Sequence, residues 1–166
     1  VDRNPEAAEE TVDLIRAEGG RAEAFAADLT RPEDVARCVD AAGAIDILHF
    51  NVGTSVRGGV VATDPADWDR VFNINVRSAY LLSRAVLPGM EAAGRGALVF
   101  ISSLAGERAG PYSYVAYEAS KAALGRMARS IAAEYAPIGI RANVIASKAG
   151  VAARETTSTR SIGYSP

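Results

Sequence analysis

Short apolar segments alternate along this chain with segments that have the apolar spacing of helices. Three apolar runs of strand length cover 45–50, 97–101 and 140–146, and helical spacing follows Asp64 and recurs from 114 to 135. Strands that are apolar almost throughout, with helices between them, are typical of a parallel sheet that is covered on both faces. The sequence therefore predicts an α/β fold with a doubly wound parallel sheet.

Composition and charge narrow the possible functions. The 166 residues are 49% hydrophobic and 23% charged, with a net charge of −2, which argues against a nucleic-acid-binding surface. No apolar run approaches the ~20 residues of a membrane span, and the first residues do not resemble a signal peptide. The one cysteine cannot form an internal disulfide. We expect a cytoplasmic globular protein that binds neither nucleic acid nor membrane, and we see no metal-binding motif.

Polar side chains are expected at the carboxyl ends of four predicted strands. Asp2, Asp28, Asn51 and Ser103 occupy these positions, and Asp28 follows a further predicted strand over 21–27. Open parallel sheets bind ligands beyond the carboxyl ends of their strands. The four residues therefore predict one shared cleft.

Tyr117 and Lys121 stand four residues apart in a predicted helix. Positions i and i+4 share a helix face, so the phenol and the ammonium should point into the same space. A nearby positive charge favours the anionic form of a phenol, and the Ser103 hydroxyl can hold a carbonyl oxygen close by. These are the groups needed to move a proton on or off an alcohol oxygen. Ser102 is a weaker candidate than Ser103, because successive strand side chains point to opposite faces.

Asn75 falls on the apolar face of the helix that follows Asp64. A buried amide must find hydrogen-bond partners. One interpretation is a structural hydrogen bond to neighbouring backbone. The other, which we favour because of the Tyr/Lys pair, is that Asn75 holds a water molecule.

The order of these motifs resembles the short-chain dehydrogenase/reductase family, over residues 1 to about 146. The matching pieces are Asn51-Val52-Gly53, Asn75 in its Phe-Asn-Ile-Asn-Val run, Ile101-Ser102-Ser103 and the segment from Tyr117 to Lys121. The resemblance implies a Rossmann-like fold and an NAD(P)-dependent reaction between a secondary alcohol and a ketone. It implies that Tyr117 is the acid/base, and that Lys121 assists it and binds the nicotinamide ribose. It also implies that Ser103 positions the substrate oxygen and that Asn75 holds a water in the proton path.

The resemblance also assigns cofactor-binding residues. Asp28-Leu29 matches the pair that flanks the adenine, and Asn51-Val52-Gly53 matches a turn that usually reads Asn-Ala-Gly. Asp2 can accept hydrogen bonds from both ribose hydroxyls and would repel a 2′-phosphate, which favours NAD. Arg3 leaves NADP possible, because a guanidinium can pair with that phosphate or stack on adenine.

Two parts of the family pattern are not found in the sequence. One is the first strand with its glycine-rich phosphate-binding turn, and the other is the Pro-Gly turn expected after Ala146. We therefore expect a partial NAD(P)-binding domain over 1–146 and a divergent tail over 147–166. We further expect this chain to be poorly stable alone and to be part of a longer enzyme.

Alternative functions remain open at this stage. The chain could be a non-catalytic remnant that does not bind the cofactor, or a member of the epimerase/dehydratase branch, which shares the Tyr/Lys pair. The helices after Asp64 and over 114–135 resemble the family's subunit interfaces, which implies a homodimer or homotetramer. Apolar residues on these helices would suit either a core or such an interface, namely Leu81, Leu82, Ala85, Met127 and Ile131.

Overall fold

The computed structural model describes residues 1–108 and 113–147, and these fall into two compact units, 1–28 and 29–147. Each unit is described by itself. The predicted tail over 147–166 lies, apart from Ser147, outside the described residues. The domain boundaries expected from the sequence stay a prediction.

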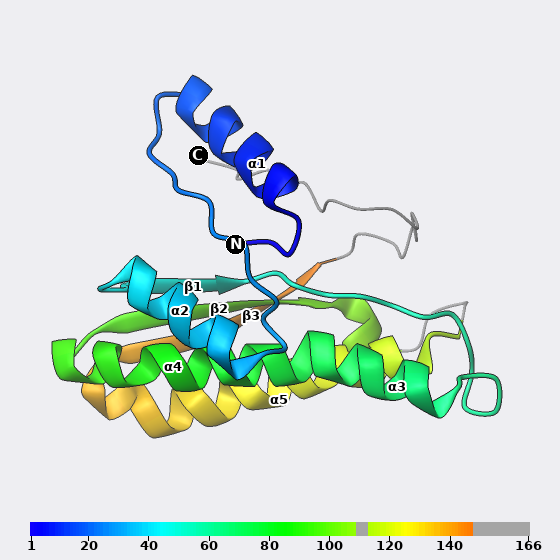
Figure 1. Cartoon of the computed structure of the whole chain (residues 1–166). Coiled ribbons are helices and arrows are strands. Elements are labelled where there is room, and N and C mark those ends of the chain that lie inside the picture. Colours follow the sequence, from blue (N-terminus) through cyan, green and yellow to red (C-terminus); the bar gives the residue numbers. More distant parts are fainter. Residues whose placement is uncertain (109–112, 148–166) are drawn as a thin grey trace. The chain divides into compact units, whose positions relative to one another are not determined.

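The first unit consists of helix α1 (Pro5–Ala17) and the extended segments on either side of it (Figure 1). Asn4 caps the helix, because its side chain accepts hydrogen bonds from the backbone N–H groups of Glu6 and Ala7 at 3.0 and 3.4 Å. The strand predicted over 21–27 is not formed. Its one described pairing is an isolated parallel bridge between Ala26 and Asp2, and a strand requires a continuous ladder with a neighbour.

The second unit is built on a parallel sheet. Within its described residues the strands are β1 (Ile47–Phe50), β2 (Gly96–Ser103) and β3 (Ile140–Ser147), in the order β1-β2-β3. Phe50 pairs with Phe100, and the two buried rings lie 6.3 Å apart between centroids. Ser103 pairs with Ser147, so β2 and β3 end together. The predicted α/β class with a parallel sheet is confirmed.

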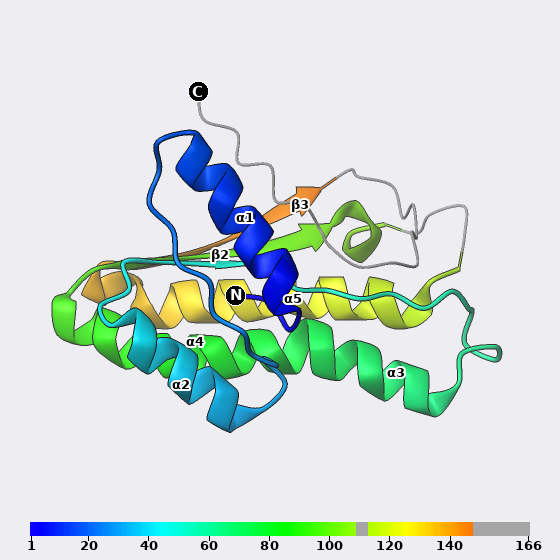
Figure 2. The ribbon, with the colours of Figure 1, turned by 45° about the horizontal axis from the view of Figure 1, so that its top comes forward.

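Helices α4 and α5 lie side by side along one face of this sheet (Figures 1 and 2). The helices of the unit are α2 (Pro32–Ala42), α3 (Pro65–Phe72), α4 (Ser78–Ala93) and α5 (Val115–Tyr135). The sequence predicted one helix after Asp64, but a π-helical turn, η1 (Asn73–Arg77), separates α3 from α4. Leu81, Leu82 and Ile131 are buried within the unit, so their apolar character is explained by its core.

A loop joins β1 to α3 and is fixed to the start of α5. Gly58 forms a parallel bridge with Tyr114, in which the Gly58 N–H donates to Ser113 at 3.0 Å and Val115 N–H donates to Gly58 at 3.1 Å. The segment after β1 therefore reaches the residues that begin α5. The sequence predicts site residues on both the segment after β1 and the first turns of α5.

Candidate active site

The candidate active site lies where the carboxyl end of β2 meets the first turns of α5. A short 3₁₀ turn, η2 (Leu104–Gly106), follows β2 directly and packs against α5. A Cβ built on Gly106 would lie 2.7 Å from the Ala122 backbone nitrogen and 2.8 Å from the Lys121 carbonyl carbon. Only glycine lets the two backbones approach this closely. Gly106 therefore brings the segment that carries Ser103 against the turn that carries Lys121.

Lys121 has a buried ammonium, which is unusual for lysine. The residue is 5% exposed, and Nζ donates a hydrogen bond to the Ile101 carbonyl at 2.9 Å. Nζ lies 5.6 Å from the centroid of the Tyr117 ring, as the spacing on the helix predicted. Burial lowers the pKa of Lys121 from 10.5 to about 8, so the side chain still carries its charge at neutral pH.

Ser102 and Ser103 have different partners at the end of β2. The Ser102 hydroxyl donates to the Lys121 carbonyl at 2.8 Å, inside the protein. The Ser103 oxygen accepts a hydrogen bond from the Ala105 N–H at 3.2 Å, so its own O–H can still donate to a ligand. This difference agrees with the preference for Ser103 that strand alternation gave.

Asn75 lies at the centre of η1 and is completely buried. Its Oδ1 accepts a hydrogen bond from Thr54 N–H at 2.7 Å, and its Nδ2 donates to the Thr54 carbonyl at 2.9 Å. The second proton of Nδ2 is directed to the Ser120 hydroxyl at 2.9 Å. The side chain thus makes the backbone hydrogen bonds that the sequence left open as one interpretation. A water-holding role stays a prediction.

Gly53 lies next to both Lys121 and Asn75. A Cβ at this position would stand 3.3 Å from the Lys121 Nζ and 3.6 Å from the Asn75 Oδ1. Gly53 is exposed, while Asn51 and Val52 are half-buried. The glycine leaves open backbone beside the ammonium, where a ligand can approach.

Three residues of this arrangement were not found from the sequence: Thr54, Gly106 and Ser120. Thr54 acts through its backbone, which carries no sequence signal. Gly106 follows Ser103 by three residues, and only the packing of η2 on α5 shows why it is glycine. Ser120 had one usable signal, because a helical serine can donate to the carbonyl three residues earlier.

A family profile and curated relatives identify the family to which this chain belongs. The profile of the short chain dehydrogenase family matches residues 1–161. The chain belongs to this family. It is 36% identical over 148 residues to a cyclopentanol dehydrogenase of Comamonas testosteroni, a match that covers 87% of this chain and 59% of the relative. The chain spans 54–59% of the length of the first curated relatives that it matches.

Solved structures that are similar to this chain confirm the predicted Rossmann-like fold. NAD⁺-bound xylitol dehydrogenase aligns with a TM-score of 0.83 at 33% identity, covering 87% of this chain and 57% of that chain. A gluconate 5-dehydrogenase from Burkholderia cenocepacia, in complex with NADP and tartrate, gives a TM-score of 0.81 at 31% identity, with 88% and 59% coverage.

The remaining cofactor-binding candidates belong to both units, and each is described within its own unit. In the first unit, Asp2 and Arg3 are exposed, and the Asp2 carboxylate accepts a hydrogen bond from Asn4 N–H at 2.9 Å. Asp28 ends that unit and is half-buried. Leu29 begins the second unit and is buried. The structure brings Tyr117, Lys121, Asn75 and Gly53 together, and the catalytic and cofactor-binding roles assigned to all the site residues stay predictions.

Arg77 fixes the chain just after Leu29 to the turn that carries Asn75. Its Nη1 donates to the Thr30 carbonyl at 2.6 Å and to the Asn73 side chain at 3.4 Å. Within the second unit, the chain that follows Leu29 is therefore held to η1.

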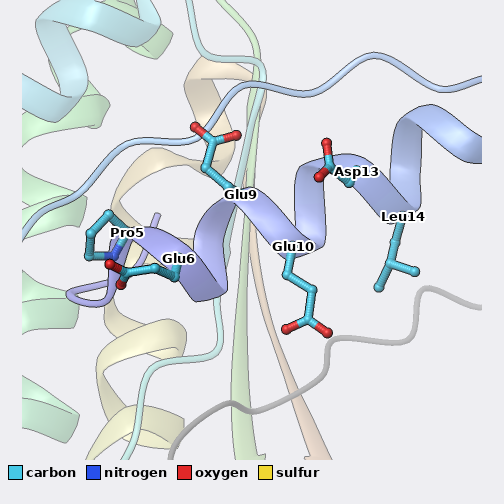
Figure 3. A pocket seen from close by; sticks show the side chains of 6 residues that line it. All are labelled: Pro5, Glu6, Glu9, Glu10, Asp13 and Leu14. Carbon is cyan, nitrogen blue, oxygen red and sulfur yellow. The ribbon is translucent and has the colours of Figure 1, made fainter.

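Outside this site, α1 carries an acidic surface hollow (Figure 3). All its lining residues belong to α1, namely Pro5, Glu6, Glu9, Glu10, Asp13 and Leu14. One helix lines it, so it is a solvated helix face. Among the described residues, no group of three or more His, Cys, Asp or Glu side chains could hold a metal ion. None of the helices in the described ranges is long and apolar enough to cross a bilayer.

Proposed function

We propose that this chain carries the catalytic site of an NAD(P)-dependent oxidoreductase that interconverts a secondary alcohol and a ketone. The observation that carries the proposal is the buried Lys121 ammonium, 5.6 Å from the centroid of the Tyr117 ring at the carboxyl end of β2. Few structural roles require a charged amine in such a position, because burial of an unpaired charge is costly. Perturbed groups of this kind are concentrated at functional sites.

The side chains of the site divide the proton chemistry between them. In the oxidation direction, the Tyr117 oxygen accepts the proton of the substrate hydroxyl. The positive charge of Lys121 stabilises the negative charge on that oxygen, and the Ser103 hydroxyl donates a hydrogen bond to the substrate oxygen. A bound nicotinamide would accept the hydride. Asn75, through its bonds to Thr54 and Ser120, holds the turn of α5 in place.

The residues present fit the nicotinamide ribose. Within the described residues, Nζ of Lys121 has the Ile101 carbonyl as its hydrogen-bond acceptor, so two of its three protons can serve a ligand. Gly53 leaves room beside that ammonium. At the adenosine end, the exposed Asp2 carboxylate favours NAD over NADP. Among solved relatives, xylitol dehydrogenase is NAD⁺-bound and gluconate 5-dehydrogenase holds NADP.

The named activities of the relatives guide the choice of substrate. They include dehydrogenases of cyclopentanol, xylitol and gluconate. We infer a small-molecule alcohol or ketone as the substrate class. A cytoplasmic homodimer or homotetramer belongs to the same proposal, and the single, buried cysteine suits a reducing compartment.

A second candidate function is a non-catalytic chain that does not bind the cofactor. It is favoured by one observation: none of the helices in the described residues begins at a glycine-rich turn. Instead α1, α2 and α3 begin at Asn4-Pro5, Arg31-Pro32 and Asp64-Pro65. Such a turn is the usual site of the pyrophosphate.

The substitution Tyr117→Phe tests the proposed reaction. Turnover of cyclopentanol, xylitol and gluconate with NAD or NADP is measured for the parent chain and the variant. Removing a general acid/base typically costs about 10²–10⁴-fold in rate. NAD binding, measured by calorimetric titration, should be unchanged, because Lys121 and Gly53 remain.

Tyr80→Phe is the matched control, since Tyr80 is 51% exposed on α4. It should retain full turnover. Turnover by Tyr117→Phe close to that of the parent would refute the acid/base role. A parent chain that binds neither NAD nor NADP would instead support the second candidate.

A further inference from the structure

Ser120 lies between the Tyr/Lys pair in sequence and is completely buried. Its hydroxyl oxygen accepts a hydrogen bond from the Asn75 Nδ2 at 2.9 Å. The same hydroxyl donates to the Tyr117 carbonyl oxygen at 2.7 Å. One small side chain therefore links the amide of η1 to the main chain of Tyr117.

The Asn75 end of this link is rigid. Thr54 bonds to both ends of the Asn75 amide, at 2.7 and 2.9 Å. With Ser120, the amide makes three described hydrogen bonds in a buried position, and rotation of its plane would break all of them. The position of the Ser120 hydroxyl is thus set from the loop after β1 and from η1.

The other end of the same helical turn is fixed separately. The Lys121 carbonyl accepts a hydrogen bond from the Ser102 hydroxyl at 2.8 Å, and the Lys121 ammonium donates to the Ile101 carbonyl at 2.9 Å. Gly106 packs against the backbone at this point. If the bond to the Tyr117 carbonyl were lost, Lys121 would keep its contacts with β2, whereas Tyr117 would lose its described link to η1.

We propose that Ser120 is a positioning residue that holds the Tyr117 ring beside the Lys121 ammonium by coupling the Tyr117 main chain to Asn75. The catalytic consequence rests on the proposed function, while the position of the ring does not. Displacement of a catalytic group by about 1 Å can cost about a hundredfold in rate. Loss of this coupling should therefore lower kcat, and the KM for NAD should change little because Lys121 stays in place.

The test compares Ser120→Ala and Ser120→Cys with the matched control Ser83→Ala. Cysteine nearly preserves the volume of serine but forms only weak hydrogen bonds, so it keeps the test usable if Ser120→Ala does not fold. Ser83 is also buried on a helix and donates to the Ala79 carbonyl at 2.7 Å, with no described link to Asn75. Its replacement costs a comparable hydrogen bond and leaves the site intact.

Two sets of measurements, one spectroscopic and one kinetic, are made on each variant of the full chain. The first is the nuclear Overhauser effect between the Tyr117 ring protons and the Lys121 side chain, together with exchange of the Asn75 side-chain amide protons. Both Ser120 variants should weaken the Overhauser effect and accelerate exchange about tenfold or more, whereas Ser83→Ala should change neither. The second is kcat and the KM for NAD.

In the Ser120 variants, kcat should fall about tenfold to a hundredfold with KM unchanged. An Overhauser effect and amide exchange equal to those of the parent would overturn the proposal, and so would an unchanged kcat in an active enzyme. If the parent shows no turnover, the proposed function fails, and the spectroscopic result alone decides the role of Ser120.

Discussion

Burial of Lys121 should make the stability of the chain depend on pH. The pKa is about 8 in the folded protein, against 10.5 for an exposed lysine. Between these values the unfolded chain binds a proton that the folded chain does not, so the free energy of unfolding rises as pH increases. Below about pH 8 both states are protonated and this contribution is at its minimum. The shift corresponds to roughly 3 kcal/mol between pH 8 and 10.5.

Urea unfolding from pH 7 to 10 measures this dependence. The sequence contains one other lysine, Lys148, which lies outside the described residues. The free energy of unfolding is plotted against pH for each variant. The difference in the slope of this plot between the parent and Lys121→Met gives the contribution of Lys121 apart from other titrating groups. Lys148→Met should keep the slope of the parent. Equal slopes for the parent and Lys121→Met would show that the folded-state pKa is not lowered.

At the residue scale, the sequence identifies side chains whose relative positions are fixed by their spacing along one helix. Tyr117 and Lys121 could be paired because a helix fixes positions i and i+4. Ser120 and Gly106 could not be assigned roles, because what they contact belongs to elements distant in sequence. The partners of Asn75 were open for the same reason. Burial required hydrogen bonds but did not say with which groups.

At the element scale, the contact between η2 and α5 depends on Gly106. In Gly106→Ala the new Cβ would meet backbone atoms of Ala122 and Lys121 at 2.7 and 2.8 Å, which cannot move aside as a flexible side chain would. Overpacking of this kind typically costs about 1–3 kcal/mol. We expect Gly106→Ala to lower the free energy of unfolding by this amount and to displace Ser103 from α5.

Gly89→Ala is the opposite case. Gly89 lies inside α4 with nothing within 4 Å of a Cβ at its position. Alanine there should stabilise the chain by about 0.5–1 kcal/mol, because glycine loses more backbone entropy in a helix. Urea unfolding measures the free energy of unfolding of Gly106→Ala and Gly89→Ala relative to the parent. Gly106→Ala as stable as the parent would mean that η2 and α5 do not approach as closely as described.

The elements that the sequence predicted well are those with a strong internal pattern. The strands at 47–50, 96–103 and 140–147 and helix α5 were found within two residues of their ends. The π-helical turn η1 was missed, since it continues the helical apolar spacing and its extra residue shows only in the hydrogen bonds. The strand expected over 21–27 depended on a neighbour, and local pattern does not supply one.

At the scale of the whole molecule, the fold class followed from the alternation of apolar strands and helices, and the family from the order of short motifs. Which residues form separate compact units did not follow from either. Asp28 and Leu29 were read as one pair, yet a unit boundary passes between them. Compactness depends on how many buried contacts each segment makes, and the sequence of a segment does not reveal its distant partners.

Hydrogen exchange should therefore differ strongly between the units. Helix α1 buries only Ala8 and Val12, whereas α5 buries seven of its residues, among them Leu124 and Ala128. Segments with few buried contacts open locally at low free energy, while core elements exchange close to global unfolding. We expect the Val12 amide to exchange at least about a hundredfold faster than those of Leu124 and Ala128, a difference of about 2.7 kcal/mol. Exchange followed by NMR measures this difference directly.

Sub-denaturing urea should accelerate the exchange of the α5 amides more steeply than that of the α1 amides, because global opening exposes more surface. Equal protection of both helices would show that α1 opens only when the whole chain unfolds.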